Sequence, residues 1–350
     1  MKNMVEASRT AKILLEDHGE YLGLDGDFRG NAFFIRDKDR QERARYGLSE
    51  VGEVTLGNGN LVSTTALCTL LENHVSVLIT GFCGNPLGIV KALDDDSHVK
   101  TRIYQYEALK NGKGIHIAKQ LAIGKIEGQN RVLQKYGLRS DTSIRLLINA
   151  LETNDLNLLR RKLLHIEGRF SQFYFNQIFQ LFPEKIRPEQ RRGFKAYDGT
   201  NNLFNLAYTV LFWKCYSALI KSKVEPYLGF LHSLQFGKPS LVCDFQEPYR
   251  YLIDDFVIQY SQTLRKSDFK KFYINHGANG KYPRLYLNHE ENIKFRKCLH
   301  NYFRRMVEIP RIRTGSRQEI ETLINEEALL FAKYLRNETE TWKPRIAPLT

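Results

Sequence analysis

The most informative stretch of this chain runs from residue 229 to residue 250: Gly229-Phe-Leu-His232-Ser-Leu-Gln-Phe-Gly237-Lys-Pro-Ser240-Leu-Val-Cys-Asp244-Phe-Gln-Glu247-Pro-Tyr-Arg250. Ser240 follows a glycine and a proline and can cap a helix, so we predict that a helix opens with the apolar pair after it. On that helix Asp244 and Glu247 stand three residues apart, which places both carboxylates on one face. Pro248 should kink the helix, because it removes a main-chain hydrogen bond.

Two interpretations of these carboxylates stay open on this stretch alone. Carboxylates that lie close together repel each other unless a cation lies between them. Arg250 continues the same face and could neutralise one of them. Alternatively, a divalent metal ion could bind both carboxylates and also His232, which lies in a loop where a ligand can be aimed freely.

The composition indicates a two-domain chain with a polyanionic partner. In 350 residues there are 52 Lys and Arg against 39 Asp and Glu, a net charge of +13. Nucleic acid is the first candidate partner and an acidic membrane surface the second. We expect no membrane association, because we find no run of eighteen apolar residues and no polybasic amphipathic helix. The polar start and the five scattered cysteines favour a cytoplasmic protein without disulfides.

The chain changes character near residue 97. Before it, short apolar runs between turns predict strands at 13–15, 21–24, 33–35, 51–56 and 75–79. One helix is expected from a Ser63 cap to about Asn73. The glycine-rich segment 81–88 is interpreted as a turn between strands, and the acidic run 94–96 as a solvated linker. We therefore predict a small N-terminal β-strand domain over residues 1–96.

Residues 97–350 are predicted to form a larger, all-helical domain, which makes the fold class α+β. Helical apolar spacing recurs at 104–109, 115–133, 143–151, 156–182, 203–220, 241–264, 290–307 and 318–335. A basic loop at 185–195 and a turn-rich segment at 276–283 interrupt this pattern. The tail 342–349 should be extended, because its two prolines exclude a regular helix.

Glu167 lies among apolar residues of a predicted helix, where a carboxylate needs a partner. By itself, an ordinary ion pair with Arg161 or Arg169 is the favoured interpretation. A separate basic group, Arg191, Arg192, Lys195 and Lys238, has tyrosines interleaved and could follow a phosphate backbone. For any single member, ordinary surface charge is the better explanation, and only the net charge favours the group.

Ordered motifs along nearly the whole chain resemble those of the CRISPR-associated spacer integrase and endonuclease family, the metal-dependent core adaptation protein. The motifs are Ile13-Leu-Leu-Glu-Asp-His-Gly-Glu-Tyr-Leu-Gly-Leu24, Arg102-Ile-Tyr-Gln-Tyr-Glu-Ala108, Ile117-Ala-Lys-Gln-Leu-Ala-Ile-Gly-Lys125-Ile-Glu-Gly-Gln129, Ile166-Glu167-Gly168 with Tyr174, Asp198-Gly-Thr-Asn201-Asn-Leu-Phe-Asn205-Leu-Ala-Tyr208, and the stretch 229–250. One departure is the run Phe204 to Tyr208, where the family usually has Leu-Asn-Tyr-Gly-Tyr.

This resemblance implies the architecture, the partners and the ligands. It implies an N-terminal domain that dimerises and a helical catalytic domain over residues 97–350. It also implies a homodimer that assembles on double-stranded DNA with a second, small CRISPR-associated adaptation protein. The metal ligands carry over as Glu167, His232 and Glu247, with Asp244 as an auxiliary catalytic carboxylate. The expected ion is Mn²⁺ or Mg²⁺.

The expected activity is that of a metal-dependent DNA nuclease and integrase, which joins 3′-hydroxyl ends of spacer DNA to the repeat array by transesterification. Arg250 and Lys238 would hold phosphates near the metal, and the loop with Arg191, Arg192 and Lys195 would grip the duplex farther away. The resemblance also makes Tyr174 and Tyr208 candidate DNA-binding residues. Two alternatives remain: a mobile-element transposase of the same fold, and a non-catalytic DNA-binding protein.

Overall fold

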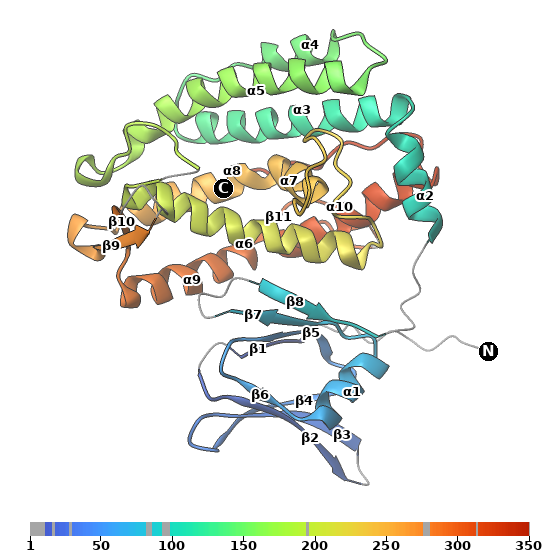
Figure 1. Cartoon of the computed structure of the whole chain (residues 1–350), viewed down its shortest axis with the longest axis vertical. Helices are drawn as coiled ribbons and strands as arrows, with labels where there is room; N and C mark the ends of the chain where they lie inside the picture. Colours follow the sequence, from blue (N-terminus) through green and yellow to red (C-terminus); the bar gives the residue numbers. More distant parts are fainter. Residues whose placement is uncertain are drawn as a thin grey trace. The chain divides into compact units, whose positions relative to one another are not determined.

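The structure of the chain is a computed structural model, and it contains two compact units, Met1–Ser97 and His98–Thr350 (Figure 1). It describes residues 11–349 with gaps at 16–17, 28–29, 82–85, 93–98, 194–195, 276–280 and 313. The acidic run 94–96 and the side chain of Lys195 therefore lie outside the described residues. The fold class is α+β, as predicted: a strand-rich N-terminal unit precedes a larger helical unit.

The N-terminal unit contains two four-stranded sheets. One has the order β1 (Ala11–Leu15), β5 (Val51–Leu56), β7 (Val77–Thr80), β8 (Pro86–Val90), and its last pair is antiparallel. The other has the order β4 (Glu42–Gly47), β3 (Gly30–Arg36), β2 (Tyr21–Asp27), β6 (Leu61–Val62). Helix α1 (Thr64–Glu72) starts where its sequence predicts, because the Ser63 hydroxyl accepts a hydrogen bond from the Ala66 amide.

All five predicted strands are present in this unit, and three more were not predicted: β4, β6 and β8. Strand β4 is charged, since three of its six residues are Glu42, Arg43 and Arg45, so it gives no apolar alternation to recognise. The predicted turn at 81–88 is wrong in its second half, since β8 begins at Pro86. The remainder of that turn lies mostly outside the described residues.

The C-terminal unit is mainly helical (Figure 1). Its α-helices are α2 (Val99–Ala108), α3 (Gly112–Lys135), α4 (Ser143–Asn149), α5 (Leu156–Ile178), α6 (Gly199–Lys221), α7 (Ser240–Gln246), α8 (Arg250–Ser261), α9 (His289–Phe303) and α10 (Ile320–Leu335). It also contains two β-hairpins, which the all-helical prediction for this domain omitted: β9 (Phe269–Asn275) with β10 (Lys281–Leu287), and β11 (Met306–Val307) with β12 (Gln318–Glu319).

Two glycines let the long helix α3 approach its neighbours closely. A Cβ atom at Gly128 would lie 2.5 Å from the ring of Tyr251, and one at Gly124 would lie 3.1 Å from Pro248. Pro248 itself breaks the predicted helix 241–264 into α7 and α8, with the 3-10 turn Glu247–Tyr249 (η3) between them. The kink predicted at this proline is therefore present, and it sits directly against the glycine face of α3.

The C-terminal tail is extended, as predicted, and it packs into the helical core. Trp342 and Ala347 are buried, and the Tyr251 hydroxyl donates a hydrogen bond of 2.8 Å to the Ala347 carbonyl. Among the described helices, only α6 is long and apolar enough to cross a membrane, and about half of its residues are buried within this unit. Such a helix is typical of the core of a folded domain.

Candidate active site

Glu167 is placed by the amphipathic pattern of α5. Leu163, Glu167, Phe170 and Tyr174 repeat at helical spacing and are all buried. The helix is fixed at its start by Asp155, whose side chain accepts hydrogen bonds from two amides of the first turn. A carboxylate is thus held on the inner face of a helix, where it needs a cationic partner.

That partner is Lys125 of α3, not the arginines expected from the sequence. The Lys125 ammonium forms an ion pair with Glu167 and a second one with Glu247 at 2.7 Å, and all three side chains are buried. Burial alone would lower the pKa of Lys125, but attraction to Glu247 and Glu167 raises it. Lys125 therefore occupies the position between two carboxylates that a metal ion could take.

Sequence reasoning missed Lys125 as a site residue, although it lies in one of the motifs that resemble the family. A signal was available: Lys125 interrupts the run 121–126 of a long helix, in which every other residue is apolar or glycine. A cation flanked by residues that permit close helix packing is held away from solvent, and we expect it to pair with buried acids.

Arg250 forms an ion pair with Glu247, one of the two carboxylates that it was predicted to neutralise. Its guanidinium lies 2.8 Å from Glu247 Oε1 and stacks over the Tyr208 ring at 4.4 Å. Burial would raise the pKa of Glu247, but Arg250 and Lys125 together lower it to about 2. Glu247 is thus ionised throughout the ordinary pH range, as a metal ligand or an ion-pair partner requires.

Asp244 has a different role from the catalytic one predicted for it. It is completely buried and accepts hydrogen bonds from the amides of Phe230 (2.5 Å), Leu231 (2.8 Å) and His232 (2.8 Å). Its Oδ1 also lies 2.6 Å from His232 Nδ1. All its acceptor capacity is therefore used in holding one loop, so Asp244 positions His232 and does not face a substrate.

Gly229 makes this arrangement possible, because a Cβ atom there would lie 2.8 Å from the Asp244 carboxylate. Burial would lower the pKa of His232, but the hydrogen bond and the charge of Asp244 raise it. With Nδ1 directed at Asp244, the imidazole presents Nε2 as its outer ligand atom. A carboxylate behind a histidine is a common support for metal-binding imidazoles.

The donor set fits a divalent cation, although the side chains are arranged around Lys125. No group of three or more His, Cys, Asp or Glu within the described parts of the chain is gathered closely enough to hold a metal ion. However, Glu167 Oε2 is buried and has no hydrogen-bond partner. This oxygen belongs to a carboxylate that shares a cation with a second carboxylate, and an imidazole held by Asp244 lies in the same region. We expect such a set of donors where a protein binds a cation.

Tyr174 and Tyr208, the two candidate DNA-binding tyrosines, are both buried, and their hydroxyls are engaged within the protein. Tyr174 donates its hydroxyl to Asp254 Oδ2 at 2.8 Å, and Tyr208 donates to the other oxygen. Burial raises the pKa of Asp254 to about 6, against the opposing effect of the two hydroxyls. The Tyr208 ring also supports Arg250, so this network stands directly behind the candidate site.

Arg191 lies next to this network and not on a distant duplex-gripping loop. Its guanidinium donates to Asn201 Oδ1 (3.0 Å) and Asn205 Oδ1 (2.8 Å), and it lies 5.3 Å from the Tyr208 ring centroid. Burial lowers the pKa of Arg191. These donors are engaged inside the protein, so Arg191 has a structural role, and its phosphate contact stays a prediction.

The other members of the basic group are more exposed. Arg192 is exposed and lines a pocket of about 320 Å³ with Arg187 and Tyr197. Lys238 is half-buried in the turn before α7, where its amide donates to the Gln235 carbonyl. The structure thus brings Glu167, His232, Glu247, Asp244 and Arg250 together, and leaves Arg192 outside that group.

The family follows from a comparison of this sequence with family models. The model of the CRISPR associated protein Cas1 family matches residues 13–295. The chain belongs to the Cas1 family. The match includes Lys125, Glu167, His232, Glu247 and every other residue of the candidate site described above.

Curated relatives agree with the assignment to the Cas1 family. "CRISPR-associated endonuclease Cas1 2" of Pyrobaculum aerophilum is 32% identical over 64% of this chain and 76% of its own length. "CRISPR-associated endonuclease Cas1 1" of Archaeoglobus fulgidus is 27% identical over 71% of this chain and 76% of its own.

Solved structures share the fold of this Cas1 chain. A Cas1 protein from Thermotoga maritima has a TM-score of 0.70 and 18% identity, with 96% of this chain and 100% of that chain covered. A casposase bound to integration product also has a TM-score of 0.70, at 21% identity, with coverage of 95% and 92%. At these identities the similarity concerns the fold alone.

Proposed function

We propose that this chain is a divalent-metal-dependent DNA endonuclease and integrase of CRISPR adaptation. It joins the 3′-hydroxyl ends of spacer DNA to the repeat array by transesterification. The observation that carries the proposal is that Glu167 and Glu247 share one buried cation position, with the supported His232 near enough that the charges of both carboxylates help to raise its pKa. Relatives named as endonucleases and the net charge of +13 support DNA as the substrate at that position.

Glu167, His232 and Glu247 would hold the ion, with Mn²⁺ somewhat better suited than Mg²⁺ because one ligand is nitrogen. Bound there, the ion would polarise a backbone phosphate and favour ionisation of the attacking 3′-hydroxyl. Asp244 keeps the imidazole oriented, and Arg250 offers its remaining donors to a phosphate oxygen. One phosphodiester bond forms as another breaks, so the reaction needs no nucleotide as an energy source.

The assembly that we propose is a homodimer formed through the N-terminal unit, residues 1–96, with residues 97–350 as the catalytic part. A small second adaptation protein would join two such dimers on double-stranded DNA. Structures with the same fold include a chain of a Cas6-RT-Cas1–Cas2 complex and a Cas1 chain in a complex with DNA. They support the proposed partners by likeness of fold only.

The test replaces each proposed ligand separately, as Glu167→Ala, His232→Ala and Glu247→Ala. Each variant is assayed for strand joining between a duplex with free 3′-hydroxyl ends and a labelled repeat-containing target in Mn²⁺. We expect joining to fall below detection, while duplex binding measured by fluorescence anisotropy stays within about twofold. Calorimetry should show that wild type binds Mn²⁺ and that each variant binds it at least tenfold more weakly.

Matched controls are available in the same region. His165 lies on α5 two residues from Glu167 and is exposed, and Glu152 is exposed just before that helix. His165→Ala and Glu152→Ala should leave both joining and Mn²⁺ binding unchanged. Retained joining in the three ligand variants would refute the metal assignment, and absence of Mn²⁺ binding by wild type would favour the non-catalytic DNA-binding protein.

Insertion of a mobile element is the second candidate function, favoured by the fold shared with a casposase. The two functions differ in the DNA that is inserted. An integrase of adaptation should join short duplexes of spacer length without regard to their terminal sequence. A transposase should instead require specific terminal sequences on a long donor, so a comparison of random-ended short donors with long ones separates the candidates.

A further inference from the structure

The C-terminal tail, residues 342–349, lies inside the helical unit as an extended segment. Its side chains alternate in burial at the start: Trp342 and Pro344 are buried, whereas Lys343 between them is exposed. An extended segment has this pattern because successive side chains point to opposite sides. One side of the tail is therefore a packing face directed at the interior of the unit.

Glu327 of α10 fixes the position of the tail. This side chain is completely buried, and the indole N–H of Trp342 donates to its Oε1 at 2.8 Å. Arg345 Nε donates to Oε2, also at 2.8 Å. The Arg345 guanidinium donates in addition to the Pro310 carbonyl at 2.9 Å. A buried carboxylate costs free energy unless it is paired, so these directed contacts hold the tail in one register.

The Trp342 ring reaches two ligand-bearing segments through one phenylalanine of α10. Its centroid lies 4.8 Å from that of Phe331, in an edge-to-face contact. The Phe331 centroid lies in turn 6.2 Å from that of Phe230 and 6.3 Å from that of Phe245, and all four rings are buried. Phe230 lies two residues before the proposed imidazole ligand, and Phe245 lies two residues before a proposed carboxylate ligand. The tail therefore supports both segments from the interior.

Pro344 supports a third segment, the glycine face of α3. A Cβ atom at Gly124 would lie 3.3 Å from the Pro344 ring and 3.1 Å from Pro248. Gly124 precedes Lys125, and Pro248 follows Glu247, the two residues whose charged groups lie 2.7 Å apart. The tail, the turn that carries Glu247 and the helix that carries Lys125 thus meet over one glycine, where packing is closest.

We propose that Trp342 and Pro344 are positioning residues of the candidate site. They hold the loop of His232, the turn of Glu247 and helix α3 at fixed separations, acting through Phe331 and Gly124. This inference rests on the proposed function, because it takes the ligands from it. A bound metal ion requires its ligands to stay within about 0.5 Å of their proper positions, so such support should determine metal affinity. A tail that only completes the core would contribute to stability alone.

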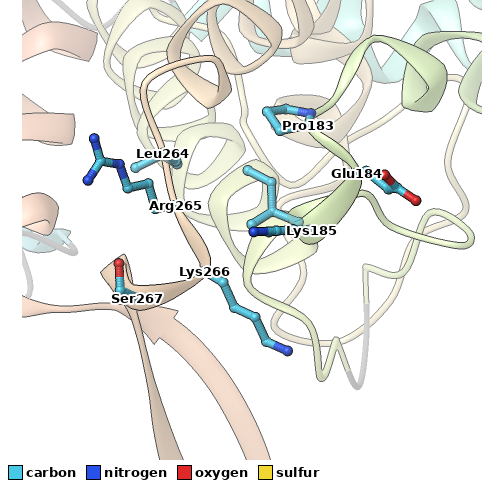
Figure 2. Close-up of a pocket in the computed structure, with 8 residues that line it drawn as sticks. Pro183, Glu184, Lys185, Leu264, Arg265, Lys266 and Ser267 are labelled. Carbon is cyan, nitrogen blue, oxygen red and sulfur yellow. The ribbon is translucent and has the colours of Figure 1, made fainter.

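The test compares the full-length variants Trp342→Ala and Trp342→Phe with a matched control, Leu264→Ala. Leu264 is buried and lines a pocket of about 590 Å³ with residues 183–186 and 265–267, which belong neither to the tail nor to a ligand-bearing segment (Figure 2). Its truncation also leaves a cavity and should make the protein less resistant to urea. A difference at the site between the tail variants and this control is therefore not a result of lost stability alone.

Hydrogen–deuterium exchange of the metal-free proteins is measured on peptides covering residues 229–250. Trp342→Ala should exchange faster there because the support of both ligand-bearing segments is lost, whereas Leu264→Ala should exchange as wild type does. By calorimetry, Trp342→Ala should bind Mn²⁺ about tenfold more weakly, and Leu264→Ala within about twofold of wild type. Trp342→Phe keeps an aromatic ring against Phe331 and loses only the N–H donor, so it should recover most of the Mn²⁺ affinity.

Pro344→Ala is a milder variant that decides the matter if Trp342→Ala does not fold. It leaves the pairing of Glu327 intact and reduces the contact at Gly124, so Mn²⁺ binding should weaken by a smaller factor in the same direction. Thermal unfolding shows whether each variant is folded. Equal changes in the tail variants and Leu264→Ala, or no change in the tail variants, would overturn the positioning role. If wild type binds no Mn²⁺, the proposed function fails, and the exchange comparison by itself then supports or overturns the hold of the tail on residues 229–250.

Discussion

Two buried carboxylate clusters of the helical unit, whose nearest members Glu247 and Asp255 are eight residues apart in sequence, show how differently buried charge can be used. At Asp255 every oxygen is satisfied: Lys135 lies 2.9 Å from one, and Tyr136, Gln259 and Tyr302 donate hydrogen bonds. At Glu167 and Glu247, Lys125 pairs with both side chains and Arg250 pairs with Glu247 alone, so Glu167 Oε2 remains without a hydrogen-bond partner.

The difference separates a structural cluster from a functional one. A buried group without a partner costs free energy, so a protein retains such a group mainly where a ligand supplies the partner. Both carboxylate oxygens of Asp255 have partners within the protein, so this cluster needs no ligand. The Glu167–Glu247 cluster lacks one such partner at Glu167 Oε2, and Arg250 Nε beside it is also without one. The missing partner, together with the two carboxylates that share one cation, distinguishes this cluster from the one at Asp255.

The largest effect expected from this comparison comes from Lys125→Met. Removal of the ammonium leaves two buried carboxylates facing each other, which should lower the free energy of unfolding by about 3–5 kcal/mol in EDTA. Mn²⁺ should restore a large part of that loss, about 2.7 kcal/mol at a hundredfold excess over its Kd, because it would replace the lost cation. Urea unfolding with EDTA or with Mn²⁺ measures both values.

Lys135→Met is the matched control. Asp255 keeps its three hydrogen-bond donors, and the Lys135 side chain is 20% exposed, so the loss should be only about 1–2 kcal/mol. Mn²⁺ should not restore it. If Mn²⁺ restored the free energy of unfolding of both variants equally, or of neither, the proposed difference between the Asp255 cluster and the Glu167–Glu247 cluster would be wrong.

A smaller effect is expected from Asp244→Asn, which keeps the shape of the side chain but replaces one acceptor oxygen by a donor. That donor must face either the loop amides or His232 Nδ1, so the imidazole loses its support. We expect Mn²⁺ to bind about 10- to 100-fold more weakly by calorimetry.

The comparison with Asp255→Asn sharpens this prediction. Asp255 contacts none of the proposed ligands, and its replacement should reduce stability without changing the Mn²⁺ affinity. An Asp244→Asn variant that binds Mn²⁺ as wild type does would show that Asp244 is only a loop anchor and does not orient a ligand.

The sequence predicts the helices and apolar strands of this fold well, because their periodicity and caps are local. The Ser63 cap, the kink at Pro248 and the extended tail could all be predicted in this way. The charged strand β4 could not, since its pairing with β3 depends on the backbone and not on an apolar pattern.

For the site, the residue types could be predicted but not their partners. The stretch 229–250 indicated His232 and Glu247, yet the role of Asp244 depends on amides of a loop 12–14 residues away. Lys125 meets Glu167 across 42 residues of sequence, and Tyr174 and Tyr208 converge on Asp254 from two other helices. Such pairings are set by how the helices pack, and a single sequence does not show that packing.

The smallest effect concerns Asp254, which is intermediate between the two clusters. It accepts hydrogen bonds from two tyrosines but forms no ion pair with a described residue, and burial raises its pKa from 3.8 to about 6. A carboxyl whose pKa is raised on folding stabilises the protein in its protonated form. That contribution is complete below pH 3.8 and is lost as the pH rises through 6, so the free energy of unfolding should increase by about 1 kcal/mol when the pH is lowered from 7 to 5.

Asp254→Asn carries no titrating group at this position and should lose this increase, whereas Asp255→Asn should keep it. Urea unfolding of the three proteins at both pH values measures the difference, and an identical pH dependence in wild type and Asp254→Asn would show that the Asp254 carboxyl is not the group that titrates.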